Sequence, residues 1–378
     1  MNGKFTRGFR VAAAGIALAA SGLAGAGVAA AGSAPRAPVP MTAYVVNQTG
    51  NTVTPIRTAT NTALKAIRVG NEPRPIVITP NGKTAYVVNT GGNHVSVIRT
   101  ATNTALTPIT VGKLPSALAV SPDGKTVYVA NSGSGTVTPI DTATNTALTP
   151  IRVGGSATAM AVTPDGKTVY VVRGYPNGAQ GYVTPIDTAT NTALTAIKVG
   201  IYPSAIAITP DGKTAYVVNG ASDTVTPIDT ATNTALKAIK VGTDPVAIAI
   251  TPNGKTAYVA NGGGNHVTAI RTATNTVLKA IKVEYYAKAI AITPNGKTAY
   301  VADSQTRHVS VIRTATNTVF KAITVGTAPM YIAITPDGKT AYVANTGAGT
   351  VTPIRIATNT AGKPIKTGYY PITIAITP

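Results

Sequence analysis

Cysteine and tryptophan are absent from the 378-residue chain, and phenylalanine occurs only 3 times. The lack of cysteine excludes a disulfide framework, a cysteine-based metal site and a cysteine-linked lipid anchor. Charged residues are scarce, at 12% of the chain, and acids are outnumbered by bases, 12 against 32. The chain is instead rich in threonine, alanine and valine, which suits many short strands with small-residue packing better than a helix-rich enzyme.

A segment of two apolar runs joined by a Pro-Asp-Gly turn, AIAITPDGKTAYVVN at Ala205 to Asn219, recurs along the chain. Its tyrosine returns every 42 residues, apart from one step of 46 residues. The tyrosines are Tyr44, Tyr86, Tyr128, Tyr170, Tyr216, Tyr258, Tyr300 and Tyr342. A fixed period of this size indicates a repeat architecture.

Each period contains four short runs rich in β-branched residues and bounded by turn signals. In one copy these predict strands at Ala205 to Thr209, Thr214 to Asn219, Thr224 to Thr230 and Ala235 to Val241. No helix is predicted. Four antiparallel strands per period are typical of a propeller blade, so the sequence predicts an all-β, eight-bladed β-propeller of four-stranded antiparallel blades.

The two ends of the chain complete one blade between them. Ala-Thr-Asn-Thr occurs eight times, and so does the first strand of the repeat, whose last copy is Ile372 to Thr377. The array, however, begins at a second strand, near Ala43. We therefore expect the C-terminal strand to pair with the N-terminal blade and close the ring, which leaves no open sheet edge. The alternative is seven blades plus a spare repeat.

The N-terminus reads as an export signal. Residues 1–31 combine a basic start (Lys4, Arg7, Arg10), an Ala/Gly/Leu-rich run and small residues at the end, as in a secretory signal peptide. Residues 32–41 are expected to be an extended linker, because proline and small residues cannot sustain a helix or a paired strand. A single propeller domain of eight repeats follows at 42–378. The alternative to cleavage is a retained N-terminal anchor.

The repeat, I-A-x-[TS]-P-[DN]-G-K-T-x-Y-V-x-N followed by V-x-x-I-D-T-x-T-N and I-x-V-G-x-x-P, resembles the YVTN-type (YncE-like) β-propeller repeat family. That resemblance implies a seven- or eight-bladed propeller and an exported or cell-surface location. This chain departs from the family where the third strand usually has valine. The prolines found there remove a ladder donor and predict irregular pairing of the fourth strand in five blades; they are Pro55, Pro139, Pro185, Pro227 and Pro353.

No catalytic, cofactor or metal site is predicted from the motifs. Pro-Asp/Asn-Gly-Lys has the residues that a tight turn requires. His94, His266 and His308 open third strands in different blades and are expected to be solvated, because a metal needs several converging ligands. The chain is therefore expected not to be an enzyme. A propeller lyase or lactonase with a site at the central channel is the alternative, and a quinone-dependent dehydrogenase is disfavoured because no tryptophan could stack on the cofactor.

Five acids lie outside the repeat pattern, and we expect all of them in the connections on one face of the ring. They are Glu72, Asp223, Asp244, Glu284 and Asp303. Scattered loop carboxylates of this kind are usually solvated rather than catalytic.

The net charge of +20, or +17 without the three bases of the signal, predicts adhesion to polyanions. For an exported protein, an anionic cell-wall polymer, a glycan or a protein is a better partner than nucleic acid. The residue that ends the third strand also divides the ring into two arcs: Arg57, Arg99, Arg271, Arg313 and Arg355 form one, and Asp141, Asp187 and Asp229 the other. One side of the turn-bearing face should therefore be more basic.

Eight of the 16 tyrosines lie outside the repeat pattern, in or near the connections on the opposite face. Tyrosine offers a rigid contact area with a polar tip, so this face is predicted to recognise a glycan or a protein. The predicted binding residues are Tyr175, Tyr202, Tyr285, Tyr286, Tyr331, Tyr369, Tyr370, Glu72, Asp244, Glu284 and Arg307. The sequence therefore predicts a monomeric, secreted or cell-wall-associated binding module.

Overall fold

The computed structural model describes residues 41–174 and 179–378. The predicted signal peptide, all of the predicted linker except Met41, and Tyr175 lie outside these residues.

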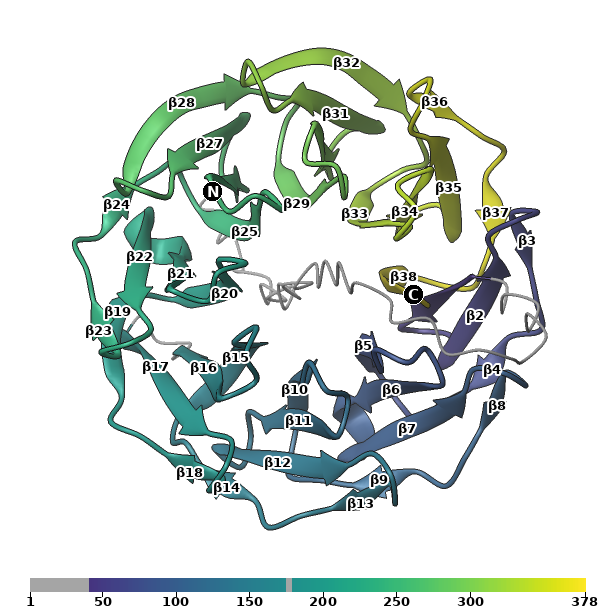
Figure 1. Cartoon of the computed structure of the whole chain (residues 1–378). Coiled ribbons are helices and arrows are strands. Elements are labelled where there is room, and N and C mark those ends of the chain that lie inside the picture. Colours follow the sequence, from purple (N-terminus) through teal and green to yellow (C-terminus); the bar gives the residue numbers. More distant parts are fainter. Residues whose placement is uncertain (1–40, 175–178) are drawn as a thin grey trace, which may run out of the picture.

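The strands of the described residues form eight sheets arranged as blades around a central axis (Figure 1). Each blade is named here after its first, innermost strand, which contacts the first strands of both neighbouring blades. Around the ring these strands are β38 (Pro371–Ile376), β5 (Pro73–Ile78), β10 (Pro115–Val120), β15 (Ser156–Val162), β20 (Pro203–Ile208), β25 (Pro245–Ile250), β29 (Ala287–Ile292) and β33 (Pro329–Ile334). The predicted eight-bladed, all-β propeller is confirmed.

The second and third strands pair along their full length in seven blades and from Thr168 to Arg173 in the β15 blade. Their valine, isoleucine and repeat-tyrosine side chains are almost completely buried. The second strands are β1 (Thr42–Asn47), β6 (Thr84–Asn89), β11 (Thr126–Asn131), β16 (Thr168–Gly174), β21 (Thr214–Asn219), β26 (Thr256–Asn261), β30 (Thr298–Asp303) and β34 (Thr340–Asn345). The third strands are β2 (Thr52–Arg57), β7 (His94–Arg99), β12 (Thr136–Asp141), β17 (Gln180–Asp187), β22 (Thr224–Asp229), β27 (His266–Arg271), β31 (His308–Arg313) and β35 (Thr350–Arg355).

The fourth, outer strand is continuous in two blades and broken in the other six described blades. The continuous strands are β28 (Thr276–Lys282) and β32 (Thr318–Thr324). The broken ones are the pairs β3 (Thr62–Ala63) and β4 (Ile67–Arg68), β8 (Thr104–Ala105) and β9 (Ile109–Thr110), β13 (Thr146–Ala147) and β14 (Ile151–Arg152), β18 (Thr192–Ala193) and β19 (Ile197–Ile201), β23 (Thr234–Ala235) and β24 (Ile239–Lys240), and β36 (Thr360–Ala361) and β37 (Ile365–Lys366).

The predicted continuous fourth strand at Ala235 to Val241 is therefore wrong, whereas the irregularity predicted from proline is confirmed. In the β20 blade the Pro227 carbonyl accepts a hydrogen bond from the Leu236 N–H at 2.8 Å, but proline has no N–H to return. Pairing then stops until Val225 meets Ile239. All five blades with proline in the third strand show this break.

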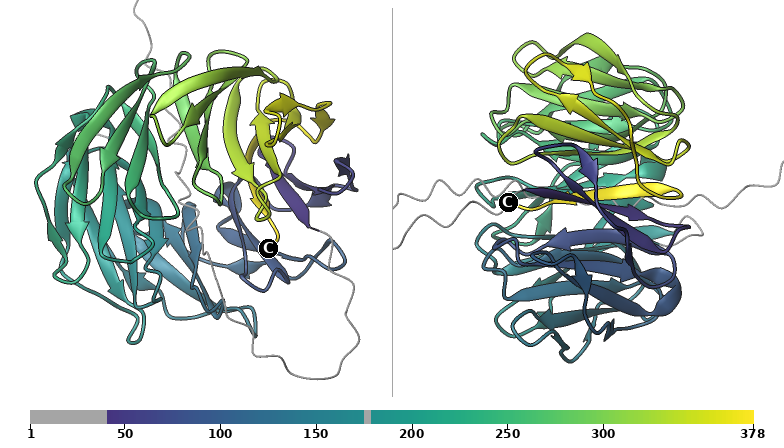
Figure 2. Two further views of the ribbon diagram at one scale, coloured as in Figure 1. Left: turned by 45° about the horizontal axis from the view of Figure 1, so that its top comes forward. Right: turned by 90° about the vertical axis from the view of Figure 1, so that its right-hand side faces the viewer.

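The C-terminal strand closes the ring, as predicted. β38 pairs with β1 in an antiparallel register that joins Ala43 to Ile376 and Val45 to Ile374. The Thr377 N–H donates to the Thr42 carbonyl at 3.0 Å. Seen from the side, the yellow C-terminal strand lies against the purple N-terminal strands within one flat ring (Figure 2). A seven-bladed ring with a spare repeat is thereby excluded.

The repeat tyrosines join each blade to the next. Each hydroxyl donates to the asparagine of the Ala-Thr-Asn-Thr turn in the following blade, for example Tyr216 to Asn275 at 2.6 Å. The bond from Tyr342 to Asn61, also 2.6 Å, continues the series across the closure. Burial raises the pKa of most of these tyrosines to about 12, so the phenols stay protonated donors at neutral pH. The asparagine has φ near +54° and so also provides the left-handed turn residue.

Two short 3-10 turns, η1 (Thr90–Gly92) and η2 (Gly220–Ser222), lie between second and third strands. In the part of the chain that the structure describes, no helix is long and apolar enough to cross a membrane.

Candidate binding surfaces

The antiparallel order of the strands gives the ring two chemically different faces. The turns between first and second strands and between third and fourth strands lie on one face, called here the turn face. The loops between second and third strands and the connections between blades lie on the other, called the loop face. Both faces carry residues that the sequence predicts to bind a partner.

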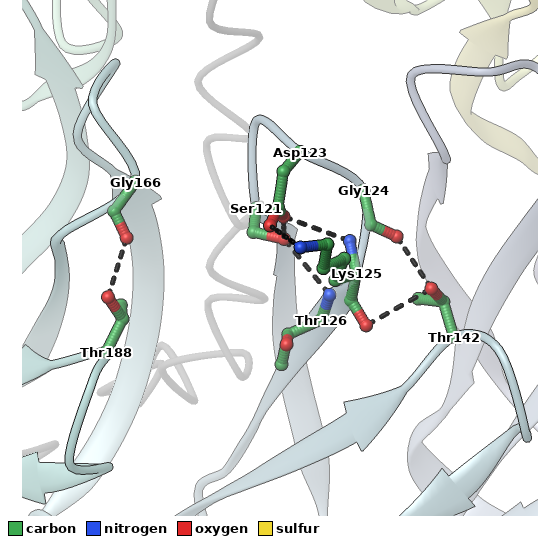
Figure 3. Close-up of polar contacts among 8 residues, drawn as sticks. All are labelled: Ser121, Asp123, Gly124, Lys125, Thr126, Thr142, Gly166 and Thr188. Atoms are coloured by element: carbon green, nitrogen blue, oxygen red, sulfur yellow. Dashed lines mark hydrogen bonds and ion pairs between the residues drawn. The ribbon is translucent and has the colours of Figure 1, made fainter.

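On the turn face, Pro-Asp-Gly-Lys forms the tight turn that its sequence predicts (Figure 3). In the β10 blade, Asp123 Oδ1 accepts hydrogen bonds from the Ser121 hydroxyl at 2.6 Å and the Lys125 N–H at 3.0 Å. Gly124 has φ of +72°, which favours glycine. The Thr142 hydroxyl donates to the Gly124 carbonyl at 2.6 Å and so ties this turn to the neighbouring Ala-Thr-Asn-Thr turn.

The aspartates of the turn face are held in their charged form by these bonds. The hydrogen bond from Ser121 is the main cause that keeps the pKa of Asp123 below its usual value. At the end of β12, Asp141 Oδ1 accepts the Thr144 N–H and the Ala143 N–H, both at 2.9 Å, and the bonds from Thr144 lower the pKa of Asp141. These acids therefore remain negative at neutral pH.

Charge is segregated around the turn face. In the β10, β15 and β20 blades, the two turn positions carry six aspartates against three lysines; we call this the acidic arc. In the other five described blades, the same positions carry nine bases and one acid, Asp337; we call this the basic arc. The bases of the basic arc are Arg57, Arg99, Arg271, Arg313, Arg355, Lys83, Lys255, Lys297 and Lys339.

The choice between aspartate and asparagine in the turns changes charge and leaves the turn geometry intact. Asn253 Oδ1 accepts from the Thr251 hydroxyl at 2.7 Å, as Asp123 does from Ser121. Lys125 then lies 3.7 Å from the Asp123 carboxylate, whereas Lys255 has an uncharged amide in its own turn. Three of the four lysines in the basic arc, Lys83, Lys255 and Lys297, thus lack the local carboxylate that would neutralise them, whereas Lys339 keeps Asp337 at 3.5 Å.

The loop face has an unusual backbone position in the connections between blades. Seven of its eight described connections hold a non-glycine residue in the left-handed region, which costs about 1 kcal/mol for a residue with a Cβ. The residues and φ values are Glu72 (50°), Leu114 (48°), Tyr202 (55°), Asp244 (49°), Tyr286 (65°), Ala328 (50°) and Tyr370 (61°).

The backbone of this position has a structural role that is independent of its side chain. Its carbonyl accepts a hydrogen bond from the loop between the second and third strands, as from Gly220 to Tyr202 at 2.9 Å and from Ser304 to Tyr286 at 3.0 Å. Glycine would adopt this conformation without strain. Three tyrosines at a strained position indicate that the side chain itself is useful.

The predicted tyrosines differ in how far they are exposed. Tyr369 is 80% exposed, and Tyr285 and Tyr370 are about half exposed, so all three can contact a large partner. Tyr202 and Tyr286 are partly buried against the loops. Tyr331 lies in β33 rather than in a connection, and burial raises its pKa to about 12. It belongs to the packing between blades more than to the surface.

The charged residues predicted for the binding site lie near these tyrosines without forming one cluster. Glu72 and Asp244 occupy the left-handed position themselves, and Glu284 precedes Tyr285. Arg307 is exposed in the loop between β30 and β31. Together with the tyrosines they span six consecutive blades from β20 to β5, so they form a broad surface rather than a pocket.

Asp303 and Glu284 form a pair that sequence reasoning missed. We expected Asp303 in a loop, but it ends β30 and is completely buried. Six sister blades have asparagine at this position. In those blades the asparagine side chain packs against a glycine of the preceding blade, such as Gly242 against Asn261. A Cβ on that glycine would lie within 2.7 Å of the asparagine side chain. Here Glu284 replaces the glycine. The sequence offered one signal for this pair: glutamate replaces the glycine and aspartate replaces the asparagine of the same contact.

The Asp303 carboxyl is perturbed by its surroundings. Burial is the main cause that raises its pKa to about 7, and the Glu284 charge adds to this. Hydrogen bonds from the Ser310 hydroxyl at 2.7 Å and the Ser310 N–H at 3.1 Å act in the opposite direction. Asp303 is therefore a titrating group inside the protein, not a surface ligand.

Two bases that depart from the repeat, Arg173 and Lys288, lie in strands. Arg173 lies one residue before the end of the second strand β16, at the position where most blades have asparagine. Its side chain is buried and stacks over Tyr182, with 5.4 Å between the guanidinium carbon and the ring centre. Lys288 lies in β29, and burial lowers its pKa while the Asp244 charge opposes that shift. Some large side chains that depart from the repeat near the loop face are therefore buried between strands and do not face a partner.

The three histidines begin β7, β27 and β31, as expected. Among residues 41–174 and 179–378, no group of three or more His, Asp or Glu side chains could hold a metal ion.

Comparisons with known proteins agree with this architecture. Residues 84–174 and 157–295, together more than half of the chain, match the family model described as YNCE-like beta-propeller. No curated protein matches the chain at a significant level.

Several solved structures are similar over most of the chain. Hydrazine synthase of Kuenenia stuttgartiensis is 25% identical, with 75% of this chain and 95% of that chain covered and a TM-score of 0.62. Dihydro-heme d1 dehydrogenase NirN is 14% identical, with 88% and 74% covered and a TM-score of 0.73. Apo AztD of Citrobacter koseri is 12% identical, with 89% and 97% covered and a TM-score of 0.69. The last two likenesses show the fold alone.

Proposed function

The chain belongs to the YNCE-like β-propeller family, and on that premise we propose that it is an exported binding module that holds an anionic polymer on the basic arc of its turn face. Export rests on the signal peptide expected at residues 1–31. The cell wall is the proposed location, and a wall polymer or other polyanion the proposed ligand. In this role the protein binds without catalysis.

The segregation of charge on the turn face is the observation that supports this function. Nine bases against one acid lie in five consecutive blades, and three of the lysines have lost the aspartate of their own turn. An extended polyanion could contact several of these blades at once. Each Lys or Arg contact would release condensed counterions, so affinity should fall steeply as salt rises.

The proposal can be tested by exchanging arginine and aspartate at the end of the third strand, because both residues occur at this position in different blades. The triple variant Arg57→Asp, Arg99→Asp and Arg355→Asp introduces the residue that Asp141, Asp187 and Asp229 provide in sister blades, so the turns should keep their shape. Binding to polyphosphate should weaken by at least tenfold and with a shallower salt dependence. The reciprocal variant Asp141→Arg, Asp187→Arg and Asp229→Arg should bind more tightly. Equal binding by both variants would contradict the proposal.

A second candidate is specific recognition of a glycan or a protein by the loop-face tyrosines. The left-handed position supports it, because Tyr202, Tyr286 and Tyr370 occupy a conformation that favours glycine. Tyrosine is enriched among the few interface residues that carry most of the binding energy.

Replacing Tyr202, Tyr286 and Tyr370 by alanine tests the second candidate. Ala328 already occupies the equivalent position, so the folded structure should tolerate the changes and the melting temperature should shift little. Specific binding in a glycan array or a cell-wall pull-down should be lost. If the same ligand is retained by this variant and lost by the turn-face variant, the site belongs to the turn face.

The enzymatic alternative is a lyase or lactonase acting at the central channel. The eight described innermost strands carry no acid and no histidine, so a catalytic carboxylate or imidazole would have to come from the connections. Turnover of a lactone or uronate by the purified protein, lost when Glu72, Asp244 and Glu284 are changed to their amides, would favour this alternative.

A further inference from the structure

Two neighbouring blades present a kind of edge that their sister blades do not. β28 and β32 are continuous seven-residue strands, and each pairs on one side with the third strand of its own blade, leaving the other edge without a strand. They follow one another along the outer rim (Figure 1). An exposed strand edge is a template for pairing with another chain.

Proline distribution explains why these two edges are continuous. Five blades have proline in the third strand, and the β5 blade, which has Val97 there, has Pro108 in its fourth strand. The β25 and β29 blades have Ala269 and Val311 at the third-strand position and no proline in the fourth strand. Their register accordingly pairs Ala269 with Lys279 and Val311 with Lys321, where the other blades make no pair.

The surface of these edges combines apolar and basic side chains. Val277 is 45% exposed and Phe320 42% exposed, and Leu278 is also exposed. Lys279, Lys282 and Lys321 lie on the same strands, and Arg313 stacks over Phe320 at 4.9 Å. The strands β27, β28, β31 and β32 carry no acid.

We propose that β28 and β32 bind an extended acidic segment of a partner protein by strand addition. The free backbone edge would supply hydrogen bonds, Val277, Leu278 and Phe320 would contact apolar side chains, and the lysines would pair with carboxylates. A second copy of this chain fits less well, because two such edges would bring lysines against lysines. The proposal concerns the outer rim and does not depend on the turn face.

The chain's own repeats provide the test. The double variant Ala269→Pro and Val311→Pro introduces the residue found in five sister blades, so it should fold normally while both outer strands break. Its probe is a labelled peptide of about ten residues that alternates glutamate with valine. We expect the wild type to bind this peptide and the double variant to bind it at least tenfold more weakly, with polyphosphate binding unchanged because no charge is altered.

Two further measurements separate strand addition from simple charge attraction. A peptide N-methylated at alternate residues keeps its charge but loses backbone donors, so its binding should fall at least tenfold. Pro227→Ala gives the β20 blade the third-strand residue of the β25 blade beside a proline-free fourth strand, so it should add a third binding site.

The proposal is overturned if the wild type does not bind the peptide, or if the N-methylated peptide binds equally well. It is also overturned if peptide binding survives in the proline variant. A wild-type dimer in sedimentation that the proline variant lacks would assign the edge to a second copy instead.

Discussion

At the scale of single residues, a close contact between neighbouring blades explains why the repeat has glycine after the valine near the end of the fourth strand. Gly200 donates its N–H to Asn219 Oδ1 at 3.1 Å, and a Cβ on this glycine would lie 2.6 Å from the asparagine Cγ. Glycine is needed there for close approach and not for a positive φ. The Glu284 and Asp303 pair is the acidic exception to this rule, and it places a carboxyl of raised pKa in the interior.

The double exchange Asp303→Asn and Glu284→Gly restores both residues of six sister blades and should stabilise the protein at pH 8. Because the pKa of Asp303 is raised from 3.8 to about 7, folding binds a proton between these values. The carboxyl therefore favours folding at pH 4 and loses that contribution as pH rises through 7. We expect a gain for the variant of about 4 kcal/mol at pH 8, because a pKa difference of one unit corresponds to about 1.4 kcal/mol.

Urea unfolding of both proteins at pH 4.5 and pH 8 measures this difference. The comparison between the two proteins cancels the other acids, such as Asp123, whose lowered pKa values make folding weaker in acid. The gain should shrink at pH 4.5. A gain that is equal at both pH values would mean that Asp303 does not titrate in the folded protein.

At the scale of elements, the second and third strands were the most predictable. Thr214 to Asn219 was predicted with its observed bounds, because its apolar residues are buried on both faces and clear turn signals flank it. The fourth strand was less predictable, because its continuity depends on whether proline occupies the position 9 to 10 residues earlier, in the neighbouring third strand. The prolines gave the warning, but the break itself is a property of the pair of strands.

The candidate site was only partly predictable for a related reason. The repeat pattern correctly separated the two faces and identified the surplus tyrosines. It could not show that Tyr202, Tyr286 and Tyr370 share a left-handed backbone, nor that Asp303 and Arg173 turn inward. Both properties depend on contacts between blades, which the order of residues within one repeat does not reveal.

The bond from each repeat tyrosine to the next blade should contribute measurably to stability. Tyr216→Phe removes the 2.6 Å bond to Asn275 and should cost about 1 kcal/mol. Asn275→Gly removes the acceptor while keeping the positive φ, so the pair of changes should show a coupling of similar size in a double-mutant cycle.

Tyr128→Phe is the matched control for this measurement. The Tyr128 hydroxyl lies 3.4 Å from Asn191 Oδ1, at the blade that contains the four-residue insertion, so its loss should cost clearly less. Equal losses at the two tyrosines would show that the phenyl ring, rather than the hydrogen bond, joins the blades.

At the scale of the whole molecule, both proposed functions use the breadth of the ring. Five consecutive blades of the basic arc and six blades of the loop-face site present repeated groups over a large surface instead of converging on a pocket. Such surfaces suit extended ligands, for which many weak contacts add up. The rigidity of the ring is what keeps these groups in fixed positions, and it depends on the one blade that the two chain ends share.

Deleting residues 372–378 should therefore destabilise the whole ring. The deletion removes the strand that pairs with β1 and contacts β5 and β33, and it exposes buried residues such as Tyr44 and Val46. We expect a loss of more than about 4 kcal/mol and an increase in hydrodynamic radius, measured by chemical unfolding and small-angle scattering.

A circular permutant separates loss of the strand from loss of the chain terminus. The chain ends in Ile-Thr-Pro and the ring resumes at Thr42, so an inserted Asp-Gly-Lys would recreate the turn that joins these strands in every other blade. With new ends between Gly154 and Gly155, this permutant keeps all eight inner strands and should melt close to the wild-type temperature. If the deletion variant instead melts at the temperature of the full chain, β38 is dispensable and the ring does not depend on closure by its two ends. If the permutant melts at the temperature of the deletion variant, the position of the chain break matters more than the presence of the strand.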